Sequence, residues 1–168
     1  MVCVETEGTM RKLLVAGALF LALAVAAVSG ACGDDDDDSS PTPDAVDVVL
    51  YFPRVTATDV EFVAVQRNVP SDQAGPAAIV QLLLDGPTSG EEAEHGVGDP
   101  FPDGVEVLSV EVDGTTATVD LSAELLDYGG GSAAVMAIGG AITETVIEAT
   151  GATEAVILVE GEPDQLQP

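Results

Sequence analysis

Histidine and cysteine, which commonly serve as catalytic residues and metal ligands, are scarce in this chain, whereas acids are abundant. Thirty acids stand against four basic residues, one histidine, His95, and two cysteines, Cys3 and Cys32. Nucleophilic catalysis needs a nucleophile and a base within hydrogen-bond reach, yet neither a Gly-x-Ser-x-Gly elbow nor a cluster with metal-ligand spacing occurs. His95 stands among glutamates, which favours a solvated histidine over a general base. Carboxylate pairs that hydrolyse glycosides stay open, but a candidate pair is uninformative where acids are everywhere. We therefore expect no catalytic residue, no cofactor and no enzymatic activity.

One acidic segment offers the ligands that calcium prefers. Its five acids are Glu91, Glu92, Glu94, Asp99 and Asp103. The spacing of an EF-hand loop is absent, so scattered and solvated carboxylates are the favoured interpretation. The aspartate run at residues 34–38 likewise lacks the turn of a calcium loop. We predict no metal site.

Two arginines are informative because they are rare. After Lys12, Arg54 and Arg67 are the only basic residues in the chain. Bidentate pairing with nearby carboxylates is the favoured role for such arginines. The sharper alternative is that Arg54 and Arg67 contact an anion or a carboxylate of a partner.

The N-terminal residues 1–31 have the pattern of a secretory signal peptide. Arg11 and Lys12 precede the uncharged run Leu13–Val28, and the small residues Ser29-Gly30-Ala31 follow. Sixteen residues are few for a membrane span, and a buried helix of a soluble core is the alternative. Glu5 and Glu7 oppose the usual basic start, so either Met1 or Met10 is the initiator.

Cys32 stands at the end of this segment. Gly30-Ala31-Cys32 resembles the lipidation site of bacterial lipoproteins, although Ser29 occupies the position that is usually aliphatic. The resemblance implies cleavage before Cys32, a diacylglyceryl group on its sulfur, and a lipid anchor on the extracytoplasmic face of the cell membrane. An ordinary signal peptide followed by an incidental cysteine is the alternative.

The segment 32–45 is predicted to be a disordered acidic tether, because aspartate, serine and proline cannot bury apolar area. Removing residues 1–31 takes away two acids and two bases, so the net charge of −26 persists. Such a charge argues against nucleic acid as a partner and against electrostatic binding to anionic lipid. Membrane contact is expected only through the N-terminal lipid.

The residues after the tether alternate between strand and helix patterns. We predict strands at 46–52 and 61–68, a helix at 75–86 and a long loop at 88–103. A second helix is expected at 132–150, with Gly139-Gly140 explained by close packing or by a kink. A strand buried in the interior of the sheet should follow at 155–160.

A β-hairpin is expected at residues 104–122. Asp113-Gly114 separates two alternating runs, and this dipeptide favours a type I′ turn with positive φ at both central residues. With this turn Val112 opposes Thr115 and Val110 opposes Ala117, which places the apolar side chains on one face. A bulge near Val107 would restore the alternation further along.

The element order is β-β-α-β-β-α-β. It predicts an α+β fold, a two-layer α/β sandwich in which two helices cover one face of a mixed sheet. The domain is expected at 46–162 and a tail at 163–168. About 115 residues after the tether suffice for one core.

Short segments along this domain carry a family resemblance. They are Val49-Leu-Tyr-Phe52, Val65-Gln-Arg67 with Val69-Pro70, Ala78 with Leu82-Leu83, Gly86-Pro87-Thr88, Pro102-Asp-Gly104-Val, Val119-Asp-Leu-Ser122, the helix with Thr143 and Thr145, and Val156-Ile-Leu-Val159-Glu-Gly161. In this order and spacing they resemble the GerMN family, the domain of spore-germination protein M. The resemblance implies that residues 75–160 are similar to the ring-building motif of secretion and sporulation assemblies, and it brings no catalytic motif.

The family is known as an extracytoplasmic module of membrane-anchored lipoproteins, tied to sporulation, germination or sensor systems. This chain has one such unit, whereas the founding member is similar to a tandem pair. We therefore expect a lipid-anchored protein-interaction or scaffold module, whose partners are other envelope proteins or further copies of itself. A ligand-binding or sensor-associated lipoprotein is the alternative.

Overall fold

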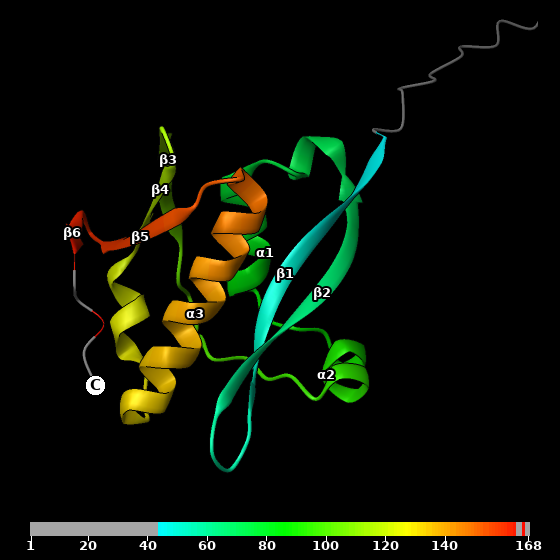
Figure 1. Cartoon of the computed structure of the whole chain (residues 1–168), viewed down its shortest axis with the longest axis vertical. Coiled ribbons are helices and arrows are strands. Elements are labelled where there is room, and N and C mark those ends of the chain that lie inside the picture. The colour runs from blue at the N-terminus through cyan, green and yellow to red at the C-terminus, as the bar shows by residue number, and fades with distance from the viewer. Residues whose placement is uncertain (1–43, 164–165, 167–168) are drawn as a thin grey trace, which may run out of the picture. The chain divides into compact units, whose positions relative to one another are not determined.

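A computed structural model describes residues 44–163 and Leu166 of the chain. The predicted signal peptide, Cys32 and nearly all of the tether lie outside the described residues. Figure 1 shows the arrangement of the elements. The strands are β1 (Ala45–Val55), β2 (Val60–Pro70), β3 (Val107–Asp113), β4 (Thr116–Leu121), β5 (Glu154–Val159) and β6 (Glu162–Pro163). The α-helices are α1 (Pro76–Leu84), α2 (Ser89–His95) and α3 (Gly131–Thr150), with short 3₁₀ turns at Ser71–Gln73 and Ala123–Asp127.

The predicted α+β class is confirmed, but the strands form two sheets rather than one mixed sheet. β1 and β2 make an antiparallel ribbon, and the second sheet has the order β3-β4-β5-β6 with β4 and β5 parallel. Helix α3 contacts β1, β4 and β5, and α1 contacts α3, β1 and β3, so the two helices lie between the ribbon and the sheet (Figure 1). The free edge of β1 faces α3, where Tyr51 N donates to Thr145 Oγ1 at 2.9 Å. This edge is therefore unavailable to the other strands.

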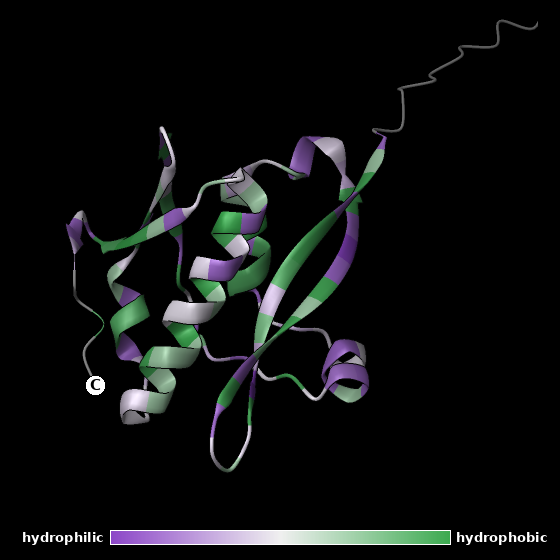
Figure 2. Ribbon diagram, in the orientation of Figure 1, coloured by the Kyte–Doolittle hydropathy of each residue, from purple (hydrophilic) through white to green (hydrophobic). Residues whose placement is uncertain are grey.

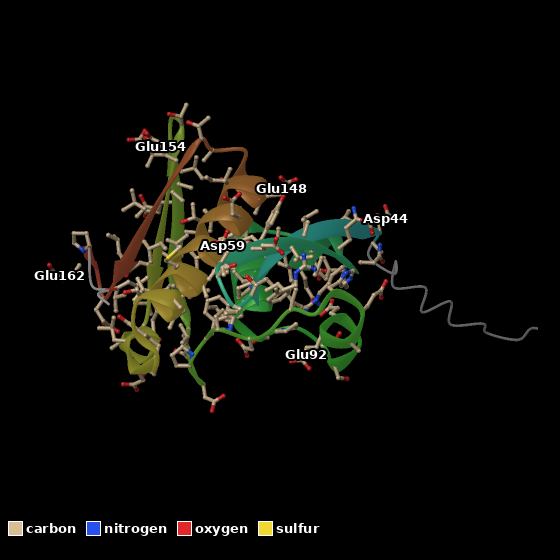
Figure 3. All side chains as sticks on the ribbon, turned by 60° about the horizontal axis from the view of Figure 1, so that its bottom comes forward. Asp44, Asp59, Glu92, Glu148, Glu154 and Glu162 are labelled. Atoms are coloured by element: carbon tan, nitrogen blue, oxygen red, sulfur yellow. The ribbon has the colours of Figure 1, made fainter. Side chains whose placement is uncertain are left out.

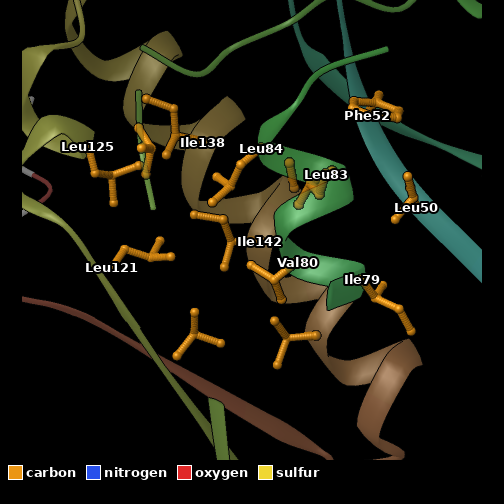
Figure 4. Close-up of a cluster of buried hydrophobic side chains, with 14 of the residues drawn as sticks. Leu50, Phe52, Ile79, Val80, Leu83, Leu84, Leu121, Leu125, Ile138 and Ile142 are labelled. Atoms are coloured by element: carbon orange, nitrogen blue, oxygen red, sulfur yellow. The ribbon is translucent and has the colours of Figure 1, made fainter. Parts of the chain in front are cut away.

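The core fills the space between the ribbon, the two helices and the sheet. Figure 4 shows the largest of its side chains converging from these elements. Alternate residues of β1 (Val48, Leu50, Phe52) and of β4 (Ala117, Val119, Leu121) are buried, as the period of two requires. The predicted second helix is confirmed in α3, on which Ile138, Ile142 and Val146 recur at helical spacing and are fully buried. Figure 2 colours the ribbon by hydropathy, and apolar residues (green) recur along these strands and helices.

Helix α3 is long and apolar enough, by length and composition alone, to cross a membrane. Its contacts assign it another role. It packs on both sheets and on α1, and its side chain Thr145 is fully buried against β1. We therefore interpret α3 as the central core helix of the domain.

The hairpin forms, but its turn lies one residue further along than predicted. Asp113 pairs with Thr116, so Gly114 and Thr115 are the central residues, and Val112 opposes Ala117. Among the described residues other than glycine, only Glu160 has positive φ, so Gly114 (φ 60°) alone supplies it in this turn. Positive φ at the first central residue alone is the pattern of a type II′ turn rather than type I′. The pairing moves by two residues, which preserves the faces of the strands.

The predicted bulge is confirmed, because the register shifts between Val107 and Ser109. Beyond the bulge Val107 turns inward, while Leu108 is left 47% exposed. The bulge thereby returns the strand to the alternation that the core requires.

Two further predictions need correction, one about where β1 ends and one about the burial of β5. β1 does not end before Pro53 but continues through it to Val55. The Pro53 carbonyl accepts from Gly98 N at 3.0 Å, so the backbone polar groups of Pro53 face away from β2. The missing N–H of proline therefore removes no hydrogen bond between β1 and β2. Strand β5 lies inside its sheet, but Val156 is 40% exposed because helices cover only one face.

The expected tail begins later than predicted. Glu160 (φ 51°) and Gly161 (φ 79°) form a tight turn, and Pro163 pairs with Leu158 in β6. The turn is held in place because Glu160 N donates to the Leu121 carbonyl and Gly161 N donates to Asp120 Oδ1. Of the predicted tail, Pro163 therefore belongs to the sheet.

Candidate interaction surface

Arg67 lies inside the domain and joins three elements. Its Nε and one terminal nitrogen donate to the two carboxylate oxygens of Glu91 at 2.8 and 2.6 Å. The guanidinium also donates to the carbonyls of Leu82 (3.1 Å) and Gly86 (2.8 Å), and its Cζ lies 5.4 Å from the centre of the Phe52 ring. The Arg67 side chain is only 15% exposed. Its guanidinium is therefore engaged within the chain, as the pairing interpretation expects.

Glu91 is fixed from two sides. Its carboxylate receives the Arg67 guanidinium, and it also accepts from Thr88 N at 2.7 Å, while the Thr88 hydroxyl accepts from Glu91 N. The last two bonds form a capping box at the start of α2. The hydrogen bond from Arg67, more than any other cause, lowers the pKa of Glu91 to about 2. The Arg67–Glu91 pair thus ties α2 to β2 and to the end of α1.

Helix α2 corrects the prediction of a long loop at 88–103. The signal was present in the sequence, because Thr88 followed three residues later by Glu91 is the capping-box pattern. Gly96 then ends the helix in the left-handed conformation (φ 65°). The helix is short and has no buried residue, so its hydrophobic periodicity gave no indication.

Arg54 lies at the surface. Its side chain is 45% exposed and donates twice to Glu61 Oε2, at 3.0 and 2.7 Å, across the β1–β2 ribbon. It also reaches the His95 carbonyl at 3.3 Å. An exposed pair of this kind contributes little stability, so Arg54 can exchange Glu61 for another carboxylate at small cost. Of the two arginines, Arg54 remains a candidate partner contact.

The acids of the segment 91–103 are not arranged around one point, although the charges of Asp103 and Glu92 act on Asp99. Glu91 is bound to Arg67, and across residues 44–163 no group of three histidine, cysteine or acidic side chains is placed to hold a metal ion. His95 ends α2 at the surface. Figure 3 shows the same dispersal more widely, with acids projecting outward from different elements: Asp44, Asp59, Glu92, Glu148, Glu154 and Glu162.

A surface groove lies where the end of β1 meets the loop after α2 and the start of α3. It has a volume of about 490 Å³, and its lining is mostly small and apolar: Pro53, Val55, Gly96, Val97, Gly98, Asp99, Pro100, Gly129, Ala133, Ala134 and Ala137. Val97 and Ala137 are buried and form its floor, whereas Val55 at its margin is 64% exposed. The sequence could not indicate this groove, because three distant segments build it.

Asp99 is the one charged residue in this lining. Its Oδ1 accepts from Phe101 N at 2.9 Å. The surrounding chain removes part of its water, and this desolvation, reinforced by the charges of Asp103 and Glu92, raises the pKa of Asp99. Within the described chain both arginines pair with other acids, Glu61 and Glu91. The Asp99 carboxylate therefore has no compensating cation in the domain.

A second open hollow, of about 540 Å³, lies over the outer face of the ribbon. Polar side chains dominate it, among them Tyr51, Gln66, Glu94, His95 and Glu148. It brings His95 near two carboxylates, but all three belong to the solvated surface rather than to a closed site.

Known proteins match this chain in family and in fold. The family model Germane, described as sporulation and spore germination, matches residues 49–165. The structure is similar to the tandem GerMN domains of the sporulation protein GerM from Bacillus subtilis, with a TM-score of 0.56 and 16% identity over 70% of this chain and 40% of that chain. It is also similar to the first GerMN domain of that protein, with a TM-score of 0.52 and 18% identity over 71% of this chain and 86% of that chain. No curated protein matches.

At this level of identity the two solved structures establish the fold, and the chain spans less than half of the tandem protein. The family model is stronger evidence of membership in the family, because its match covers nearly every described element, from within β1 to the end of β6. The resemblance expected from the sequence is thereby confirmed, and the chain belongs to the Germane family of GerMN domains, a sporulation and germination family rather than a class of enzymes.

Proposed function

We propose that this chain is a lipid-anchored, extracytoplasmic protein-interaction module of the GerMN type, working in a sporulation, germination or other envelope assembly. The observation that carries the proposal is the extent of the family match, residues 49–165, which takes in nearly the whole described domain. We therefore assign the interaction role to the GerMN domain as a whole. Cys32 after its apolar run supports the anchor.

The surface supports an interaction role over the enclosure of a small ligand. Sites for small molecules bury most of the ligand in a concave pocket. The two hollows described above, of about 490 and 540 Å³, are both open to solvent, and the first is bordered by the exposed side chain Val55. Such an open surface suits a segment of another protein, which brings its own bulk to cover the groove.

The anchor is tested on the protein from its native membrane. We expect the N-terminal peptide of the mature chain to begin at Cys32 and to carry the mass of acyl chains. The variant Cys32→Ala should lose these chains and no longer partition into detergent. An unacylated N-terminal peptide from the wild type would remove the lipoprotein part of the proposal.

The interaction role is tested by affinity capture of the full-length chain from detergent-solubilised membranes. The proposal predicts that one or a few envelope proteins are recovered in constant proportion to the chain. The recovery of a small molecule in place of a protein would contradict it and would favour a ligand-binding lipoprotein. Cys32→Ala, expressed at the same level, serves as the control for contacts that depend on the membrane.

A further inference from the structure

The groove between β1, the loop 96–100 and α3 has walls that are largely backbone and methyl groups. Gly96, Gly98 and Gly129 contribute no side chain, and Ala133 and Ala134 contribute one carbon each. A Cβ built on Gly98 or Gly129 would meet no atom within 4 Å. With a volume of about 490 Å³, the groove has room for a bulky apolar side chain that comes from outside. Its buried floor, Val97 and Ala137, would give that side chain apolar contacts.

The lining of this groove carries a single charged side chain, which is Asp99. Asp99 forms no ion pair, while the buried Arg67 is bound to Glu91 and the exposed Arg54 pairs with Glu61. The net charge of the whole chain is −26. A positively charged partner would thus be attracted over a distance. The Asp99 carboxylate, which accepts from Phe101 N and lies against Gly86, has no cation of its own among the described residues. A second copy of this chain would bring further acids and only the exposed Arg54, so charge disfavours it as the occupant.

We propose that this groove binds a segment of a partner protein that inserts an apolar side chain against Val97 and Ala137 and places a lysine or arginine beside Asp99. The inference rests on the proposed function and specifies the chemistry of the partner. The groove supplies the buried contact, and Asp99 selects for the cation.

Three short synthetic peptides test the two parts of this recognition on the full mature chain. Acetyl-Lys-Leu-Leu-Lys-amide carries both features, acetyl-Glu-Leu-Leu-Glu-amide reverses the charge, and acetyl-Lys-Gly-Gly-Lys-amide lacks the apolar side chains. In NMR titrations we expect the first peptide to shift the amides of Gly96, Gly98 and Gly129 in a saturable manner. The second should cause no shift there, and the third only weak shifts spread over the acidic surface. Equal, scattered shifts with the first and third peptides would overturn the proposal.

Two pairs of variants separate the groove from the rest of the surface. Gly98→Leu adds a bulky side chain at a lining position without positive φ or a clash, and should weaken binding of the Lys-Leu peptide at least about tenfold, the equivalent of losing one buried apolar contact. Gly75→Leu also points into open space, away from the groove, and should bind as the wild type does. Unchanged binding by Gly98→Leu would exclude the groove.

Asp99→Asn keeps the acceptor for Phe101 N but removes the charge. It should weaken binding about fivefold, the range of an exposed ion pair, while Asp72→Asn at another exposed acid should not. A purely structural role for Asp99 predicts a lower melting temperature, whereas relief from desolvation and repulsion predicts a higher one. Weaker binding together with a higher melting temperature is therefore the result that we expect, and unchanged binding would overturn the role of Asp99.

The same variants distinguish this inference from the proposed function. If affinity capture from membranes recovers an envelope protein with the wild type and equally with Gly98→Leu, the chain is an interaction module that uses another surface, and the groove proposal is wrong. If Gly98→Leu loses the partner and Gly75→Leu keeps it, the groove is the docking site. If the wild type itself captures no protein, the proposed function fails first.

Discussion

At the scale of single residues, Gly140 shows how one position sets the spacing between a helix and a strand. The sequence left close packing or a kink as explanations for Gly139-Gly140, and the structure decides for packing at one of them. A Cβ on Gly140 would lie 2.0 Å from Cζ of Phe62, whose ring comes from β2 and covers the helix at this point. A Cβ on Gly139 would meet nothing within 4 Å, and α3 continues through both positions.

The neighbouring glycines should therefore respond to alanine in opposite directions. Gly140→Ala forces the Phe62 ring outward and should lower the free energy of unfolding by about 1–3 kcal/mol. Gly139→Ala should raise it by about 0.5–1 kcal/mol, because alanine favours the helix and finds open space. Urea unfolding of the mature chain measures both. Similar responses at the two sites would show that the Phe62 ring does not rest on Gly140, and Phe62→Ala should reduce the cost of Gly140→Ala.

The Arg67–Glu91 pair makes stability depend on pH in a defined window. Because the folded pKa of Glu91, about 2, lies below its usual value of 4.5, the folded chain favours the ionised carboxylate. The contribution of this group is complete above about pH 4.5 and disappears as the pH falls toward about 2. Glu91→Gln should cost about 2 kcal/mol at neutral pH, because the guanidinium then lacks its counter-charge, and should flatten the acid limb of the stability curve. Glu92→Gln on the exposed side of α2 is the control. Parallel acid limbs in wild type and Glu91→Gln would contradict this assignment.

At the scale of the elements, the sequence predicted which strand residues share a face better than it predicted where the turn between the strands lies. Alternation assigned Val110, Ala117 and Val119 to one face, and this held although the turn moved by one residue. The face that a strand residue occupies depends only on the alternation of side chains along the strand. The position of the turn depends instead on local competition between two dipeptides that both contain Gly114, Asp113-Gly114 and Gly114-Thr115. The second sheet was missed for another reason: the edge of β1 is closed by Thr145, and a side-chain bond between residues so distant leaves no local signal.

The same distinction applies to the candidate surface. Pairing of the arginines with acids was predictable from their rarity in an acidic chain, but the difference between the buried Arg67 and the exposed Arg54 depends on tertiary position. The groove was not predictable, because β1, the loop 96–100 and α3 contribute to it from distant parts of the sequence.

The hairpin turn gives a prediction that separates backbone strain from crowding. Gly114 has φ 60° with open space around it, so Gly114→Val meets no clash but must place a β-branched residue in the left-handed region. We expect a loss of about 1–3 kcal/mol in the free energy of unfolding. Gly129→Val, equally uncrowded and without positive φ, should change it by less than about 0.5 kcal/mol. Identical melting of both variants and the wild type would mean that the turn is built differently.

At the scale of the whole molecule, charge opposes folding. A net charge of −26 is held closer together in the folded chain than in the unfolded chain. Raising the ionic strength from about 0.05 to about 1 M shortens the screening length to about 3 Å, below the spacing of typical surface charges. The melting temperature of the chain should therefore rise with sodium chloride over this range. A flat or falling melting temperature would show that the acids are spaced or paired well enough to be harmless.

The measurement that tests the central claim most directly is photo-crosslinking of the full-length chain in the cells that produce it. A photoreactive residue is placed in turn at exposed positions on different faces of the domain: Ala133 beside the groove, Gln66 on the ribbon and Val156 on the open face of the sheet. If the chain is a membrane-anchored interaction module, at least one position gives a discrete adduct with a second protein, and the adduct is lost when Cys32→Ala releases the chain. Adducts with lipid or solvent alone, at all three positions, would contradict the account.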